Sequence, residues 1–133
     1  MTLEIGIAAD DTSLYSSMAT PSVSIDNDGY YWYLHPLFED LQRQTGQYIN
    51  LYGNAEFTGT NIKAFIEMLQ RAKGLISLQA NNWDVHIGTQ TEPEKRKLFS
   101  AVDKRKFFDL IRQLEKIAEA AETTDCRIVC IGD

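Results

Sequence analysis

Two histidines, His35 and His86, are the first residues to consider for catalytic or metal-binding chemistry. His35 precedes Pro36 and has Glu39 four residues later, but the H-E-x-x-H pattern of zinc enzymes is absent. His86 follows Trp83 in a segment that alternates apolar and polar residues, so a strand would turn its imidazole toward the wetter face. Neither histidine has the companion ligands or acids that a metal site or proton transfer requires. We therefore expect no catalytic residue and no metal.

The other sequence patterns that carry chemistry are incomplete or missing. The chain has no glycine-rich phosphate-binding motif and no G-x-S-x-G nucleophile motif. Aligning the glycine after Asp28 with position six of a calcium loop puts His35 where a glutamate is needed, so Asp26 and Asp28 predict a turn. Cys126 and Cys130 lie about 13 Å apart along a predicted strand, too far for a disulfide, so we expect free thiols. No cofactor is expected.

The first half of the chain combines acidic with aromatic residues. Residues 1–62 hold eight acidic residues and one basic residue, a net charge of −7, whereas residues 63–133 carry +1. This charge disfavours nucleic-acid binding, because phosphates would be repelled, and it favours docking of a basic protein. Tyr and Trp are favoured in protein interfaces. We therefore predict a partner-binding surface made of Asp26, Asp28, Tyr30, Tyr31, Trp32, Glu39 and Asp40.

Two alternatives use the same aromatic residues differently. The aromatic group, which also includes Tyr48, Tyr52 and Trp83, could form core with only its polar tips at the surface. A cleft lined by Tyr31, Trp83 and His86 could instead make the chain a small enzyme or a ligand-binding domain. Sequence alone leaves both alternatives open beside the protein-binding hypothesis.

A third alternative is a structural homodimer. The predicted hairpin over residues 83–102, or the last predicted helix, could supply the contact. Two basic runs, 95–97 and 104–106, flank the junction between this hairpin and that helix. Lysine at a helix N-terminus opposes the helix dipole, so these runs do not serve helix stability. They could bind an anion or an acidic patch on a second copy.

Hydrophobic periodicity predicts the elements that would position these residues. Alternation predicts strands over 3–9, 47–52, 83–88, 98–102 and 126–131, a short strand near 23–25, and an extension over 55–58. Helical spacing predicts helices from Pro36 to Gly46, from Thr60 to between 74 and 79, and from an Asp103 cap to about 121. This order predicts an α+β fold with a single mixed, mainly antiparallel sheet and about three helices packed largely on one face.

Length and hydropathy predict one domain and no membrane segment. A chain of 133 residues suits a single domain over 1–133. No stretch approaches the roughly 20 apolar residues that span a bilayer, and the first residues lack the basic region of a signal peptide. We therefore expect a cytoplasmic protein without a membrane partner.

Four segments resemble those of small uncharacterised bacterial proteins, from about residue 26 onward. They are Asp28-Gly29-Tyr30-Tyr31-Trp32, Gln47-Tyr48-Ile49-Asn50-Leu51-Tyr52-Gly53, Trp83-Asp84-Val85-His86-Ile87-Gly88 and Cys130-Ile131-Gly132-Asp133. As a class, the chain is similar to immunity proteins of bacterial toxin systems, which are small, acidic α+β proteins without an active-site motif. This resemblance implies a non-catalytic protein that binds and neutralises a cognate toxin, and the charge of the first half favours a basic one.

Overall fold

The computed structural model describes residues 2–8, 19–91 and 95–132, which form six strands and three helices. The strands are β1 (Thr2–Ala8), β2 (Ala19–Asp26), β3 (Asn54–Phe57), β4 (Asn82–Gln90), β5 (Arg96–Asp103) and β6 (Arg127–Ile131). The helices are α1 (Gly29–Thr45), α2 (Thr60–Ser77) and α3 (Lys104–Thr123). The predicted α+β class is confirmed.

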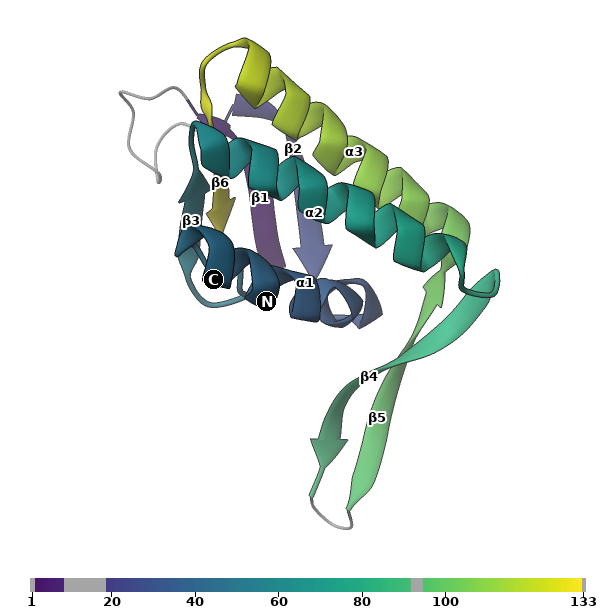
Figure 1. The fold of residues 1–133 in the computed structure, drawn as a ribbon. Coiled ribbons are helices and arrows are strands. Elements are labelled where there is room, and N and C mark those ends of the chain that lie inside the picture. The colour runs from purple at the N-terminus through teal and green to yellow at the C-terminus, as the bar shows by residue number, and fades with distance from the viewer. Residues whose placement is uncertain (1, 9–18, 92–94, 133) are drawn as a thin grey trace.

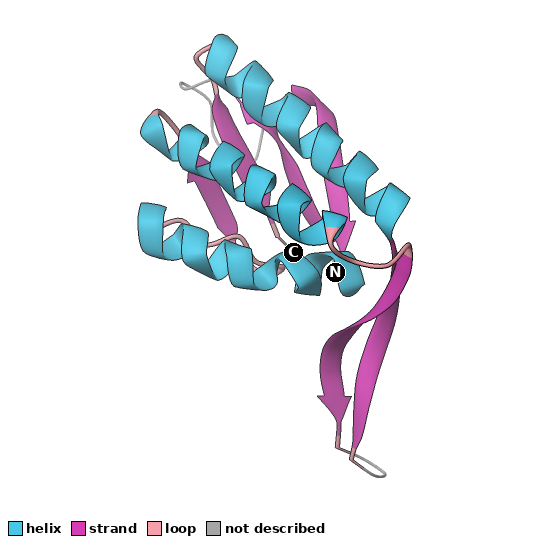
Figure 2. Ribbon diagram, turned by 45° about the vertical axis from the view of Figure 1, so that its right-hand side comes forward, coloured by secondary structure: helices cyan, strands magenta, loops and turns pink. Residues whose placement is uncertain are grey.

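The core lies between a four-stranded sheet and a layer of three helices. The sheet has the order β2-β1-β6-β3, and every pairing in it is antiparallel. The helices cover one face of it, with α2 between α1 and α3 (Figures 1 and 2). In the central strands Ile5 lies opposite Cys130, and both are buried under the helices. The apolar alternation in the sequence therefore marks the inner face of this sheet.

The hairpin of β4 and β5 stands apart from this sheet. It forms its own two-stranded antiparallel sheet and projects away from the helices and the main sheet (Figure 1). Only its base is anchored: the Trp83 ring packs against Tyr33 and Phe107, and the Asp103 N–H donates to Tyr30 Oη at 3.0 Å. The mainly antiparallel pairing predicted from the sequence is confirmed, but the strands form two sheets where a single sheet was predicted.

Helix α1 begins seven residues earlier than predicted. Asp28 is its N-cap and accepts a hydrogen bond from the Tyr30 N–H at 3.0 Å, which satisfies one of the free donors of the first turn. Pro36 therefore lies inside the helix, on its exposed side. Proline has no N–H to bond the carbonyl four residues earlier, and on this side of the helix water can donate to that carbonyl instead. The aromatic run is helical, so its rings point in different directions around α1.

The predicted strand over 47–52 is a loop in the structure. Side chains here take the place of ladder hydrogen bonds: Asn50 Oδ1 accepts from the Tyr52 N–H at 2.8 Å, and Gln47 Oε1 accepts from the Glu56 N–H at 3.0 Å. The apolar residues of the segment, Ile49 and Leu51, are still buried. Buried and exposed residues alternate here because a loop packs on the core, so the pattern that predicted a strand has another cause.

Both cysteines are free thiols. Cys130 is buried in β6, and this burial raises the pKa of its thiol, while Cys126 is half-buried just before the strand.

None of the helices in the described part of the chain is long and apolar enough to cross a membrane.

Gly74 gives a test of the helical layer. It lies inside α2 at an exposed position, and a Cβ built there would meet no atom within 4 Å. We expect Gly74→Ala to raise the free energy of unfolding by about 0.5–1 kcal/mol in urea denaturation, because alanine loses less backbone entropy. The control is Gly46→Ala: Gly46 ends α1 with φ +79°, so this variant should be destabilised. A loss of stability in Gly74→Ala would contradict the assignment of α2.

Candidate functional site

One face of α1 and the loop after it form a surface of aromatic, histidine and carboxylate side chains. Trp32, His35 and Glu39 follow the i, i+3, i+7 spacing that places residues on one side of a helix. The loop that follows α1 brings Tyr48 against His35, and it also carries Tyr52, whose phenol is near enough to influence Tyr31. These five residues are called the α1 surface below.

His35 is the centre of the α1 surface. Its Nε2 lies 2.7 Å from Tyr48 Oη, and its Nδ1 lies 3.4 Å from Glu39 Oε1. The Trp32 ring lies 5.2 Å from the imidazole, measured between centroids. Nε2 is thus hydrogen-bonded to a phenol, and Nδ1 lies within ion-pair distance of a carboxylate. The imidazole links the loop after α1 to the helix.

Trp32 is held in place from two directions. Its indole N–H donates to Asn27 Oδ1 at 2.7 Å, and its ring meets Tyr31 edge-on at 5.0 Å. Its own ring remains partly exposed, and the side chain of Tyr52 is 67% exposed. An exposed aromatic ring that is already fixed loses little entropy on binding, so this arrangement suits a protein interface.

Tyr31 lies beneath this surface and belongs to the core, with only 2% of its surface exposed. Desolvation by burial, with smaller contributions from Tyr48, Tyr52 and Glu39, raises the pKa of Tyr31 to about 12. Burial likewise raises the pKa of Tyr48. Both phenols therefore stay neutral at physiological pH and act as hydrogen-bonding and packing groups.

The predicted partner-binding residues divide between surface and structure. Asp26 is exposed and Glu39 is half exposed, so both can meet a partner. Tyr31 is buried, which removes it from the predicted set. Tyr30 packs on Phe107 and accepts the Asp103 N–H, so it serves the base of the hairpin.

The remaining two acidic residues of the prediction have local structural roles. Asp28 caps α1, and burial raises the pKa of its carboxyl group. Asp40 pairs with Arg43 and, at 3.2 Å, with Arg71, and these hydrogen bonds lower its pKa. An acid already paired with two guanidinium groups contributes little to recognition of a basic protein.

The alternative cleft is not assembled. Tyr31 is buried, Trp83 packs on the base of α1 and α3, and His86 is exposed on the opposite face of β4. The neighbours of His86 are the Phe99 ring at 5.6 Å and Thr89 Oγ1 at 3.5 Å. The structure thus separates the three residues that the ligand-binding hypothesis grouped together.

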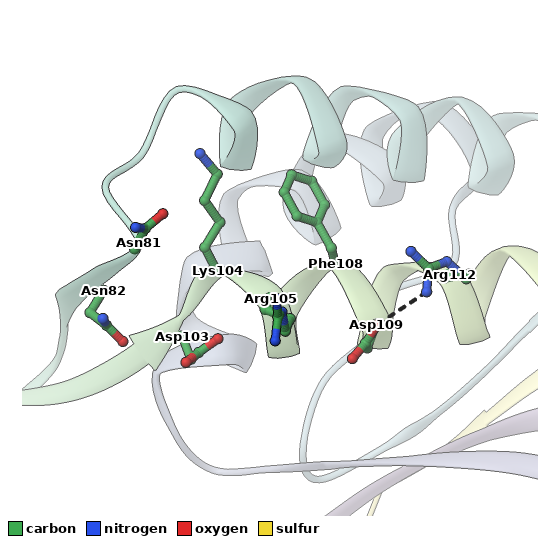
Figure 3. A pocket seen from close by; sticks show the side chains of 8 residues that line it. All are labelled: Asn81, Asn82, Asp103, Lys104, Arg105, Phe108, Asp109 and Arg112. Atoms are coloured by element: carbon green, nitrogen blue, oxygen red, sulfur yellow. Dashed lines mark hydrogen bonds and ion pairs between the residues drawn. The ribbon is translucent and has the colours of Figure 1, made fainter.

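A hollow of about 510 Å³ lies instead where the hairpin meets α3 (Figure 3). Its lining residues are Asn81, Asn82, Asp103, Lys104, Arg105, Phe108, Asp109 and Arg112. Most of its charged groups have local partners. Lys104 Nζ donates to the carbonyls of Ser77 and Gln79, at and just beyond the last residue of α2. The Asp103 carboxylate caps α3, and Asp109 pairs with Arg112 at 3.1 Å. The contacts of Lys104 and Asp103 stabilise helix ends, and the Asp109–Arg112 pair lies within α3.

Metal-ligand geometry is also missing from the part of the chain that the structure describes. No group of three or more His, Cys, Asp or Glu side chains there is arranged to hold a metal ion. His35 and Glu39 supply two such groups, and each is already engaged with the other. Chemically, the α1 surface presents hydrogen-bonding groups and fixed aromatic area, which is what binding requires.

Comparison with protein-family models, curated proteins and solved structures finds no match. The geometry and charge of the α1 surface are therefore the basis for assigning a function.

Proposed function

We propose that the protein is a non-catalytic binding module whose α1 surface docks on a basic partner protein, in the manner of an immunity protein that neutralises a toxin. The observation that carries this proposal is the pair of aromatic side chains fixed beside His35, Trp32 held by Asn27 and Tyr48 bonded to the imidazole, with the largely exposed Tyr52 on the same loop as Tyr48. Pre-ordered Trp and Tyr side chains are typical interface hot spots.

Charge supports a basic partner. Glu39, at His35, and Asp26, next to Asn27 in the sequence, are exposed acids in the half of the sequence that carries −7. Complementary fields of this kind accelerate association and weaken as salt is added. An acidic surface can also cover a cationic site, such as one that binds nucleic-acid phosphates, and so block a toxin.

The geometry favours binding over catalysis. A general base needs a free lone pair within reach of a substrate. Here the Nε2 of His35 lies 2.7 Å from Tyr48 Oη, a partner within the protein. The groups of the α1 surface are thus arranged to hold a fixed shape, which serves recognition.

The test compares capture by the wild-type protein and by a double variant, Trp32→Ala with Tyr52→Ala. Each tagged protein is exposed at low salt to lysate from its source organism. We expect the wild type to retain one basic protein and the double variant to bind it at least about 30-fold more weakly, the loss of two hot-spot contacts at about 1 kcal/mol or more each. The control is Leu78→Ala, which alters a residue 84% exposed at the end of α2.

Neutralisation needs its own measurement. The captured protein, expressed alone in a host, should inhibit growth, and co-expression of the wild type should restore it. The double variant should fail to protect, while Leu78→Ala should protect fully. Equal capture by the wild type and the double variant would contradict the assignment of the α1 surface as the binding site. A captured protein that does not inhibit growth would contradict the immunity role.

A further inference from the structure

Beyond the base of the hairpin, where Trp83 packs against Tyr33 of α1, the outer edge of β4 is open to pairing with another strand. The hairpin of β4 and β5, called the arm below, projects from the body (Figure 1). Among the described strands, β4 pairs only with β5. A two-stranded hairpin alone is marginally stable in water, and an unpaired edge presents a row of backbone donors and acceptors. The arm therefore gains stability from any strand that joins it.

Other strand edges carry features that discourage such pairing. In the main sheet, β3 has only four residues and β2 contains Pro21. In the arm, β5 carries Lys97 and leads directly into the basic run 104–106. Strand β4 has nine residues and neither proline nor lysine. Its register shift falls between His86 and Gly88, which leaves 82–86 as a regular stretch for pairing.

We propose that this edge pairs antiparallel with the same edge of a second copy, so that Asp84 of each chain lies opposite His86 of the other. The pattern of β4 is self-complementary about Val85: the acid precedes it by one residue and the imidazole follows it by one. Each imidazole can then donate an N–H to a carboxylate, twice per dimer. Opposite-charge and hydrogen-bonded pairs directly across strands stabilise a sheet.

Other registers of the β4–β4 pairing give less favourable side-chain pairs across the interface. A two-fold axis at Asp84 would place two carboxylates opposite each other, which is destabilising. An axis at His86 would leave Asp84 opposite Gly88, without a donor. A register shifted by one residue would place even-numbered residues of one copy opposite odd-numbered residues of the other. The face of β4 that carries Asp84 and His86 would then meet the face that carries Val85, because side chains alternate along a strand. Val85 is thus the favoured centre.

Charge also decides which edge a second copy uses. Antiparallel pairing through β5 would bring the basic run 95–97 of one arm against the basic run 104–106 of the other. Pairing through β4 gives the order β5-β4-β4-β5 and keeps these basic runs on the two outer edges. This interface does not involve the α1 surface, so it is independent of the proposed function.

The oligomeric state tests this proposal by sedimentation velocity at about 100 μM. The wild type should have twice the 15.1 kDa mass of one chain. His86→Asp should weaken the dimer at least about tenfold, because it places two acids opposite each other. Adding Asp84→His to that variant restores opposite partners and should return the affinity to within about threefold of wild type. Lys63→Glu, on the exposed side of α2, is the control.

The register is tested by a cysteine at the proposed axis. Directly opposite Cα atoms in an antiparallel pair are about 4.5–5.5 Å apart, within reach of a disulfide. Val85→Cys should therefore form a covalent dimer under oxidising conditions, whereas Phe99→Cys on β5 should not. A monomeric wild type, failure of the charge exchange to restore the dimer, or a dimer without the Val85→Cys cross-link would each overturn the proposal.

Discussion

Replacing Phe107 by alanine should lower the free energy of unfolding by about 3–5 kcal/mol, the cost of deleting a fully buried phenylalanine. Phe107 is completely buried in α3. Its ring lies 5.1 Å from Tyr30, 5.4 Å from Tyr33 and 6.1 Å from Trp83, measured between centroids. It is the side chain on which α1, α3 and the arm meet, so its loss leaves a cavity that no single neighbour can fill.

Urea denaturation followed by circular dichroism measures this effect. Small domains are stable by about 5–15 kcal/mol, so Phe107→Ala should leave a marginal protein. Its neighbour Phe108 is only partly buried, and Phe108→Ala should cost clearly less. Amide exchange at Trp83 should also accelerate in Phe107→Ala, because the base of the arm loses its support. A cost below about 1 kcal/mol, or a larger cost for Phe108→Ala, would contradict this packing.

Gly132→Ala should have the second largest effect, about 1–3 kcal/mol or more of lost stability. A Cβ at this position would lie 2.6 Å from the Leu51 carbonyl carbon and 2.8 Å from the Asn50 carbonyl oxygen. These are backbone atoms, which cannot turn aside as a flexible side chain would. The Gly132 N–H also donates to the Gly53 carbonyl at 2.9 Å. The variant must therefore displace the loop that carries Tyr48 and Tyr52.

This displacement gives Gly132→Ala a second readout. Partner binding should weaken along with stability, because two of the five residues of the α1 surface move. Gly74→Ala makes the same chemical change at an open helical position, so it should be stabilised and should bind normally. A Gly132→Ala variant as stable as wild type would contradict the close approach of Gly132, just after β6, to the loop.

Local patterns were sufficient to predict much of the fold. The stripe of apolar residues and the Asp103 cap predicted α3, and both are found, with the Asp103 carboxylate accepting the Lys106 N–H at 3.0 Å. The alternation in β4 and β5 predicted the hairpin. These elements are determined by residues close in sequence, where periodicity and capping are strong signals.

The start of α1 was not predicted, because competing signals overlap there. Tyr and Trp favour strands, and Pro36 suits a first helical turn, so the sequence placed the helix start too late. The structure instead begins α1 from the Asp28 cap and buries Tyr31 against Phe38 and the loop after the helix. Tertiary packing of the aromatic rings outweighs their local preference.

The α1 surface was predicted only in part for a similar reason. Trp32 and Glu39 were named from composition, but the role of His35 depends on Tyr48, which is 13 residues away in a loop. That contact exists only because the loop folds back along α1. The i, i+4 spacing of His35 and Glu39 was the one local signal of the cluster.

The most direct test of the binding function places a photoreactive amino acid at position 52, the most exposed point of the α1 surface, in cells of the source organism. The same amino acid at position 63, exposed on α2, is the control. Irradiation should link position 52 to one basic protein and position 63 to none. Absence of a specific product at position 52, or the same products at both positions, would contradict a partner-binding role for the α1 surface.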